Sequence, residues 1–252
     1  MLVLLVFLAC APESDRRVAG ADSDNPADTG AADTDTDTDT DTSTVDTGPC
    51  PAGMALVGEA LCVDRWEATL ADHSPYEVPE GGVAHTASGV VPQGYISGSV
   101  ASLACEAAGK RLCAVEEWLL ACAGEEARTW PYGNTYDATA CNDHYAGGHP
   151  VVDYFGTSTG VWDSEHLNDP GINQQAGTVT LTGELPACVT PDGVFDLHGN
   201  LHEWVADPEG TFKGGFYADA EINGPGCSYT TTAHDVGYHD YSTGFRCCAN
   251  AR

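Results

Sequence analysis

The chain of 252 residues is long enough for one sizeable domain with a tail, or at most for two small domains. Its 38 acidic residues far outnumber its 9 basic residues, and the net charge is −29. Such a chain offers no basic patch to neutralise phosphates, so nucleic acid and anionic membrane surfaces are not expected partners. The acidity has two open interpretations: adaptation to solubility or a saline habitat, and binding of divalent cations.

Residues 1–10 form an apolar segment that ends at Cys10. The segment is too short to cross a bilayer, which takes about 20 apolar residues, and it is typical of the apolar core of a secretion signal. Residues 7–10 resemble a bacterial lipobox, although no positive residues come before the segment and Phe7 stands where Leu is usual. We expect Cys10 to carry a lipid anchor, the only contact with a membrane; an ordinary cleaved signal is the alternative.

Residues 11–49 are predicted to be a disordered linker. They hold 11 acids and 2 bases, and an Asp-Thr unit repeats five times from Asp33 to Thr42. Like charges at every second residue repel one another, and the repeat offers no apolar side chain to bury. A lipid at Cys10 followed by this spacer indicates a domain held away from a membrane in the bacterial cell envelope.

Ten of the eleven cysteines lie from Cys50 onward, inside the predicted domain at 50–252. An even number of cysteines at this density indicates an oxidising compartment and up to five disulfides. Cys50 and Cys62 are close enough in sequence for a local bridge. Cys247 and Cys248 are adjacent and could bond to each other only with strain, so we expect each to bridge elsewhere.

Regular elements are predicted to be few and short in this domain. Apolar residues bounded by glycines favour a strand and hairpin over 50–62, followed by a strand over 63–67. One helix is expected from an N-cap at Ser99 to Ala108, with Gly109 as its stop, and a second from Ala114 to Cys122. Residues 124–193 read as irregular. The last two predicted strands cover 211–217 and 244–248.

The stretch 193–204, GVFDLHGNLHEW, fits neither the helical nor the strand period. Gly199 and Asn200 both tolerate positive φ and predict a tight turn. Such a turn would bring Asp196 and Glu203 together with backbone carbonyls, and hard oxygen ligands on a bent backbone are what Ca²⁺ takes. The alternative is that the two carboxylates only accept hydrogen bonds from backbone amides of the turn.

This stretch resembles the central signature of the formylglycine-generating enzyme (sulfatase-modifying factor) family, Gly-x-x-Asp-x-x-Gly-Asn-x-x-Glu-Trp. The segment GKRLCAVEEW at 109–118 resembles the family's GKRLPTEAEW. Further resemblances follow the family's order, at residues 62–67, 130–134, 213–215 and 244–247. The resemblance covers residues 50–248 and implies a loop-rich α+β domain of the C-type-lectin-like fold.

The same resemblance implies ligands and disulfides. It assigns structural calcium to the side chains of Asp196 and Glu203 and the carbonyls of Gly199 and Leu201, and it places Asn142 in a first calcium loop. Trp204 is expected in the core. For the disulfides the resemblance implies Cys122–Cys247 or Cys122–Cys248, and then Cys141–Cys227.

The family oxidises a substrate cysteine to formylglycine with a copper ion held by two cysteines just after its RGGS motif. Soft thiolates suit Cu(I). Here Asp219 and Gly224 stand where those cysteines would fall, Phe216 replaces the motif serine, and His202 replaces an aromatic residue. Copper is therefore not expected, and we predict a binding or structural module with a protein or glycan ligand. An oxidoreductase with a divergent cysteine site is the alternative.

Two further kinds of site, for zinc and for carbohydrate, can be considered from the sequence. His198 and His202 have a spacing that binds zinc on a helix, but the Gly199-Asn200 turn between them argues against a helix. A carbohydrate site would need exposed rings, which Tyr136, Tyr145, Tyr154 and Trp162 could supply.

Overall fold

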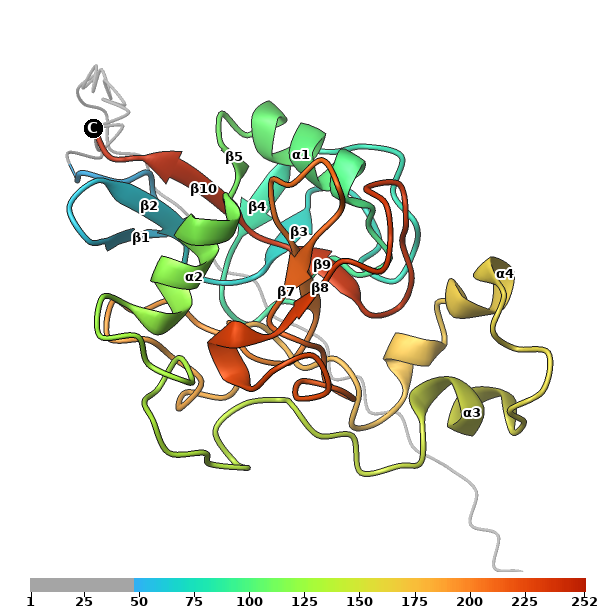
Figure 1. Ribbon diagram of the computed structural model, residues 1–252. Coiled ribbons are helices and arrows are strands. Elements are labelled where there is room, and N and C mark those ends of the chain that lie inside the picture. The colour runs from blue at the N-terminus through green and yellow to red at the C-terminus, as the bar shows by residue number, and fades with distance from the viewer. Residues whose placement is uncertain (1–47) are drawn as a thin grey trace, which may run out of the picture. The chain divides into compact units, whose positions relative to one another are not determined.

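The structure is a computed structural model that describes residues 48–252 (Figure 1). Cys10 and the Asp-Thr repeat lie outside the described residues. Three small sheets, short helices and long loops make up the α+β domain, as predicted. Among the helices that the structure describes, none is both long and apolar enough to cross a membrane.

The first sheet joins the two ends of the domain. Its strands are β1 (Met54–Val57), β2 (Leu61–Asp64), β10 (Cys247–Asn250) and β5 (Arg111–Leu112), in the antiparallel order β1-β2-β10-β5. The predicted hairpin is present, with Gly58 at φ 61° in its turn. The predicted strand over 63–67 is wrong beyond Asp64, because β2 ends there.

The second sheet lies at the centre of the molecule (Figure 1). Its order is β8 (Thr230–Thr231), β7 (Phe212–Lys213), β6 (His202–Trp204) and β9 (Thr243–Phe245), with β6 and β9 parallel. A separate pair consists of β3 (Ala68–Leu70) and β4 (Ala84–Thr86). Only Arg246 separates β9 from β10, so the single strand predicted over 244–248 is in fact two strands in different sheets.

Helix α1 (Gly98–Ala107) and helix α2 (Val115–Ala123) correspond to the two predicted helices. The N-cap of α1 is Ser97 rather than Ser99, because the Ser97 side chain accepts the hydrogen bond from Val100 N. Ala114 cannot cap α2 with its side chain. There the Glu117 carboxylate accepts a hydrogen bond from Ala114 N at 2.8 Å instead.

Residues 150–174 are helical in part, so the prediction of irregular structure over 124–193 is wrong there. Helix α3 (Pro150–Phe155) and helix α4 (Ser164–Leu167) extend to one side of the domain, and η1 (Ile172–Gln174) leads back to it (Figure 1). Both helices have sequence signals that periodicity over so few residues cannot reveal: Pro150 at the first turn of α3, and Asp163 as the N-cap of α4. The remaining short helix is η2 (Gly226–Ser228).

Five disulfides bond all ten cysteines of the described residues. Cys50 bonds to Cys62, the expected local pair. The implied long-range pairs are wrong, because Cys122 bonds to Cys227 and Cys141 bonds to Cys188. The adjacent cysteines do bridge elsewhere, as Cys105–Cys247 and Cys113–Cys248. Since neighbouring residues of a strand point to opposite faces, these two bridges attach β10 to α1 on one side and to the start of α2 on the other.

Candidate functional site

The turn at 196–201 is the buried centre of the domain. Asp196, Gly199 and Asn200 have φ of 59°, 80° and 57°, so the predicted positive-φ turn at Gly199-Asn200 is present. A Cβ on Gly199 would lie 2.1 Å from the carbonyl oxygen of Asn142, which restricts this position to glycine. Asn200 N donates to that same carbonyl at 2.8 Å. The turn therefore packs directly on the loop that contains Asn142.

Glu203 forms a buried ion pair at the end of this turn. Its Oε1 accepts from Arg246 Nη2 at 2.5 Å, and its Oε2 accepts from Arg246 Nε and from Trp118 Nε1, each at 2.6 Å. Arg246 is fully buried and also donates to the carbonyls of Asp64 and Phe195. One carboxylate thus joins α2, β6 and the junction between β9 and β10.

A second buried carboxylate, Glu67, also holds the turn. Its Oε2 accepts from Asn200 Nδ2 at 2.5 Å and its Oε1 accepts from Leu201 N at 3.1 Å. Burial, and then the charges of Asp196 and Glu203, raise the pKa of Glu67 well above its usual value. Glu67 and Arg246 were not among the predicted site residues. Both lie inside matched motifs, at 62–67 and 244–247, which was the signal available.

Asp196 is the remaining carboxylate of the cluster. Its Oδ2 accepts from Gly183 N at 2.7 Å. Burial raises the pKa of Asp196 to about 6, although the amide of Gly183 and the charge of Arg246 act in the other direction. The cluster therefore has three carboxylates around one guanidinium, and two of them, Glu67 and Asp196, hold protons more readily than exposed carboxylates do.

The predicted calcium ligands do not fit a Ca²⁺ ion in this arrangement. Both oxygens of Glu203 are engaged by Arg246 and Trp118, and the Asn142 amide group donates to Asn200 Oδ1 and Thr178 O. Among the described residues no group of three His, Cys, Asp or Glu side chains is placed to hold a metal. The alternative, in which both carboxylates accept from backbone amides of the turn, is not matched either: Asp196 accepts from Gly183 N outside the turn, and Glu203 accepts from the side chains of Arg246 and Trp118. Calcium stays an untested prediction.

The two histidines of the turn lie in different environments. His198 Nε2 contacts Asp143 Oδ2 at 3.0 Å, and both side chains are buried. His202 packs among the rings of Phe212, Phe216 and Tyr229, with ring centroids 4.6–5.4 Å away. Burial lowers the pKa of His202 to about 3. His202 is thus a neutral core residue.

The segment after Lys213 is where the family's copper ligands would be expected. The ammonium group of Lys213 lies 5.6 Å from the Trp118 ring and donates to Thr230 Oγ1, and its burial lowers the pKa of Lys213. A Cβ on Gly215 would lie 2.4 Å from the Cα of Ala220. The chain therefore reverses direction tightly before it reaches position 219.

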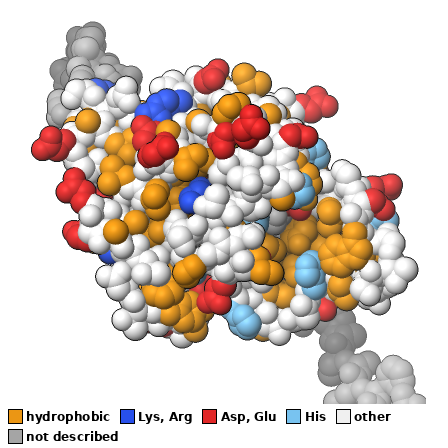
Figure 2. Space-filling view, viewed as in Figure 1, with side chains coloured by type: hydrophobic (Ala, Val, Ile, Leu, Met, Phe, Trp, Pro, Cys, Tyr) orange, Lys and Arg blue, Asp and Glu red, His pale blue; other side chains and the backbone are white. Residues whose placement is uncertain are grey.

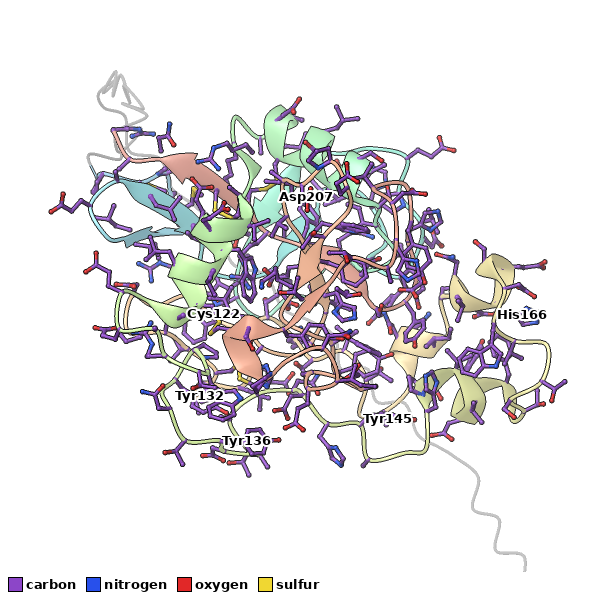
Figure 3. The ribbon with its side chains drawn as sticks, viewed as in Figure 1. Cys122, Tyr132, Tyr136, Tyr145, His166 and Asp207 are labelled. Atoms are coloured by element: carbon purple, nitrogen blue, oxygen red, sulfur yellow. A yellow bond between two sulfur atoms is a disulfide. The ribbon has the colours of Figure 1, made fainter. Side chains whose placement is uncertain are left out.

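Asp219 has structural contacts within this segment. Its Oδ1 accepts from the amides of Glu221 and Ile222, and its Oδ2 accepts from the Tyr229 hydroxyl at 3.2 Å. Gly224 has φ 116°, a conformation that a cysteine would adopt only with strain. The nearest cysteine, Cys227, is bonded to Cys122, which lies in α2 (Figure 3). Positions 219 and 224 thus supply no thiolate for Cu(I), and this site does not fit copper.

The domain described above has the loop-rich α+β architecture of the C-type-lectin-like fold. The family model described as "Sulfatase-modifying factor enzyme 1-like domain" matches residues 62–251. The chain therefore belongs to this family. No curated protein matches the chain.

Solved structures similar to this chain agree only in general architecture. PvdO from Pseudomonas aeruginosa is 15% identical with a TM-score of 0.47, over 76% of this chain and 80% of that one. The U1 and P3c variants of Major Tropism Determinant are 14% and 13% identical, with TM-scores of 0.45 and 0.46. Both comparisons cover 81% of this chain but 54% of the other, so this chain spans about half of those proteins.

Proposed function

We propose that this domain is a non-catalytic member of its family and acts as a binding module outside the cytoplasm, held by a lipid anchor at Cys10. The observation that supports the loss of oxidase activity is the segment after Lys213. Asp219 and Gly224 occupy the two positions of the copper ligands, and Asp219 is committed to hydrogen bonds with Glu221, Ile222 and Tyr229. The chemistry of the family needs thiolates there.

The disulfides support both parts of the proposal. All ten cysteines of the described residues are bonded in five pairs, which leaves none of them as a thiolate nucleophile or metal ligand. Disulfides at this density are typical of proteins outside the reducing cytosol. A domain with an acidic spacer before it would then be free to meet ligands at a distance from the membrane.

Peptide mass spectrometry under non-reducing conditions, after alkylation of free thiols, tests the loss of activity. We expect no alkylated cysteine from Cys50 onward. With Cu(I) and oxygen, we also expect no conversion of a cysteine-containing peptide to formylglycine. A pair of free thiols that includes Cys227, Cys247 or Cys248, together with such conversion, would establish the alternative, an oxidoreductase with a divergent site.

The anchor is tested separately by labelling cells with a radioactive fatty acid. The expressed full chain is expected to take up the label and to fractionate with membranes, whereas Cys10→Ala abolishes both. Label that persists in the Cys10→Ala variant, or an unlabelled wild-type chain in the soluble fraction, would refute lipid attachment at this residue.

A further inference from the structure

A cavity of about 390 Å³ opens beside α4, away from the segment discussed above. Its walls are α4, Trp162 in the loop before that helix, and the segment 235–239. In Figure 2, hydrophobic side chains gather beside histidines on this side of the molecule, where α3 and α4 extend from the domain. His166 marks the position of α4 in Figure 3.

Hydrogen bonds fix the two walls of this cavity relative to each other. The Asn168 amide donates to His239 O at 3.2 Å, and its Oδ1 lies 2.8 Å from His239 Nδ1. Tyr241 N donates to Leu167 O at 3.1 Å. The carbonyl of Val236 accepts two hydrogen bonds from Ser99, which fixes the 235–239 segment to α1. The cavity is therefore preformed, as ligand sites usually are.

Trp162 gives this cavity an aromatic wall. The residue is 49% exposed, the largest exposure of any aromatic residue in the described range. Its Nε1 donates to Ser158 O at 2.8 Å, and the His149 ring meets it edge-on at 5.0 Å with an interplanar angle of 80°. The indole is thus held in one orientation while half of its surface stays open to solvent. A fixed ring loses little entropy when a ligand stacks on it.

Polar groups with unused hydrogen-bonding capacity line the same cavity as the indole. Asp235 Oδ1 accepts from Gly237 N, but within residues 48–252 no hydrogen bond reaches its Oδ2. His239 uses Nδ1 and leaves Nε2 without a partner in that same range. The Ser164 hydroxyl accepts weakly from Asn168 at 3.4 Å and still has a proton to donate. The cavity thus offers an acceptor, an imidazole nitrogen and a hydroxyl near one exposed aromatic ring.

From this combination we propose that the cavity binds a neutral glycan, with one pyranose ring stacked on Trp162 and its hydroxyl groups bonded to Asp235, His239 and Ser164. A pyranose has one apolar C–H face and a rim of hydroxyls that both donate and accept, which matches this lining. Anionic sugars are disfavoured because Asp235 lines the cavity and no Lys or Arg does. The inference rests on the proposed function as a binding module and names its ligand class.

The test uses the mature chain on an array of oligomers of glucose, galactose, mannose and N-acetylglucosamine, beside anionic glycans and a peptide library. Binding of the best neutral oligomer is then measured by calorimetry. We expect Trp162→Ala to weaken this binding by about tenfold or more, because it removes the stacking surface. Trp162→Phe keeps a ring and is expected to lose less. Asp235→Asn removes one charged acceptor and is expected to weaken binding severalfold.

Tyr136→Ala is the matched control. Tyr136 is also exposed, at 40%, but it does not line the cavity. Its ring packs instead against Trp130, with the ring centroids 5.6 Å apart. The control is expected to bind like the wild type. The proposal is overturned if no neutral glycan is retained, if Trp162→Ala and Tyr136→Ala behave alike, or if only a peptide binds in a Trp162-dependent way. These outcomes leave the proposed loss of oxidase activity intact, since the thiol and conversion assays measure that independently.

Discussion

His202 shows how one substitution can change the electrostatics of the core. The imidazole lies among Phe212, Phe216 and Tyr229, and its Nδ1 has no hydrogen-bond partner within the described residues. Its neutral form suits these surroundings, and its charged form does not. The family resemblance places an aromatic residue here, so the core around β6 has room for a ring of this size.

We predict that His202 makes the domain sensitive to acid. Its pKa is about 3 in the folded state against 6.5 for a free histidine, so the unfolded state binds the proton first as pH falls. The free energy of unfolding should therefore drop between about pH 6.5 and pH 3, by up to about 1.4 kcal/mol per pH unit from this group. His202→Phe should lose this contribution in urea unfolding measured across that range. An unchanged slope in His202→Phe would contradict the assignment.

Asp196 makes the free energy of unfolding depend on pH in the opposite direction, and it also provides a test for calcium. Its pKa of about 6 lies above the ordinary value of 3.8, so ionisation costs stability as pH rises from about 4 to 6, and the cost remains at pH 7. Asn tolerates positive φ and can still accept from Gly183 N, so Asp196→Asn should gain about 1–2 kcal/mol at pH 7. We expect EDTA and calcium chloride to leave the Tm of both proteins unchanged. A calcium-dependent rise in Tm that Asp196→Asn abolishes would show that the carboxylate is a calcium ligand after all.

The junction between β9 and β10 depends on a single buried ion pair. Arg246 reaches Glu203 from the one residue that separates two strands of different sheets. Removing one partner of such a pair leaves the other charge buried and unpaired, which typically costs about 3–5 kcal/mol. We predict a loss of this size for Arg246→Met in chemical denaturation. Arg111→Met is the control, because the Arg111–Glu117 pair is partly exposed and should contribute less than about 1 kcal/mol. Equal losses in the two variants would refute this difference.

The elements that the sequence predicted well are those with a local signal. Gly199-Asn200 predicted its own positive φ, and the hairpin before Cys62 followed from the glycines around an apolar run. The break at Arg246 had no local signal, because residues 244–248 form a plausible continuous strand and only the buried Glu203 explains why the chain changes sheet there. Calcium was inferred at Glu203 for the same reason: the sequence does not show that Arg246, 43 residues away, occupies the carboxylate.

The disulfide pattern is a property of the whole molecule and could not be predicted from spacing. Ten cysteines admit many pairings, and resemblance alone suggested Cys122 as the partner of Cys247 or Cys248. Only the fold shows that α1 and the start of α2 lie on either side of β10, so that Cys105 and Cys113 take the adjacent cysteines. Cys122 lies near the C-terminal end of α2 and bonds to Cys227, so this disulfide joins α2 to η2.

The two bridges to adjacent cysteines close almost the same loop, which makes their contributions to stability strongly non-additive. Cys105–Cys247 spans 142 residues and Cys113–Cys248 spans 135. When either bridge is intact, the other closes only a small ring. That ring consists of residues 105–113, residues 247–248 and the two disulfides. Removing one should therefore cost roughly 2–3 kcal/mol, as expected for a short loop. Removing the second as well should cost roughly 4 kcal/mol more, because the intact Cys122–Cys227 bridge still shortens the long loop.

A double-mutant cycle measures this coupling. Cys105→Ala/Cys247→Ala and Cys113→Ala/Cys248→Ala are made separately and together, and the free energy of unfolding is taken from urea titrations. We expect the combined variant to lose clearly more than the sum of the two. The local pair Cys50–Cys62 spans 12 residues, and its removal should add independently to either. Simply additive losses at the two long-range bridges would contradict this prediction. Each bridge would then restrain a different part of the unfolded chain, and the two bridges at β10 would not close nearly the same loop.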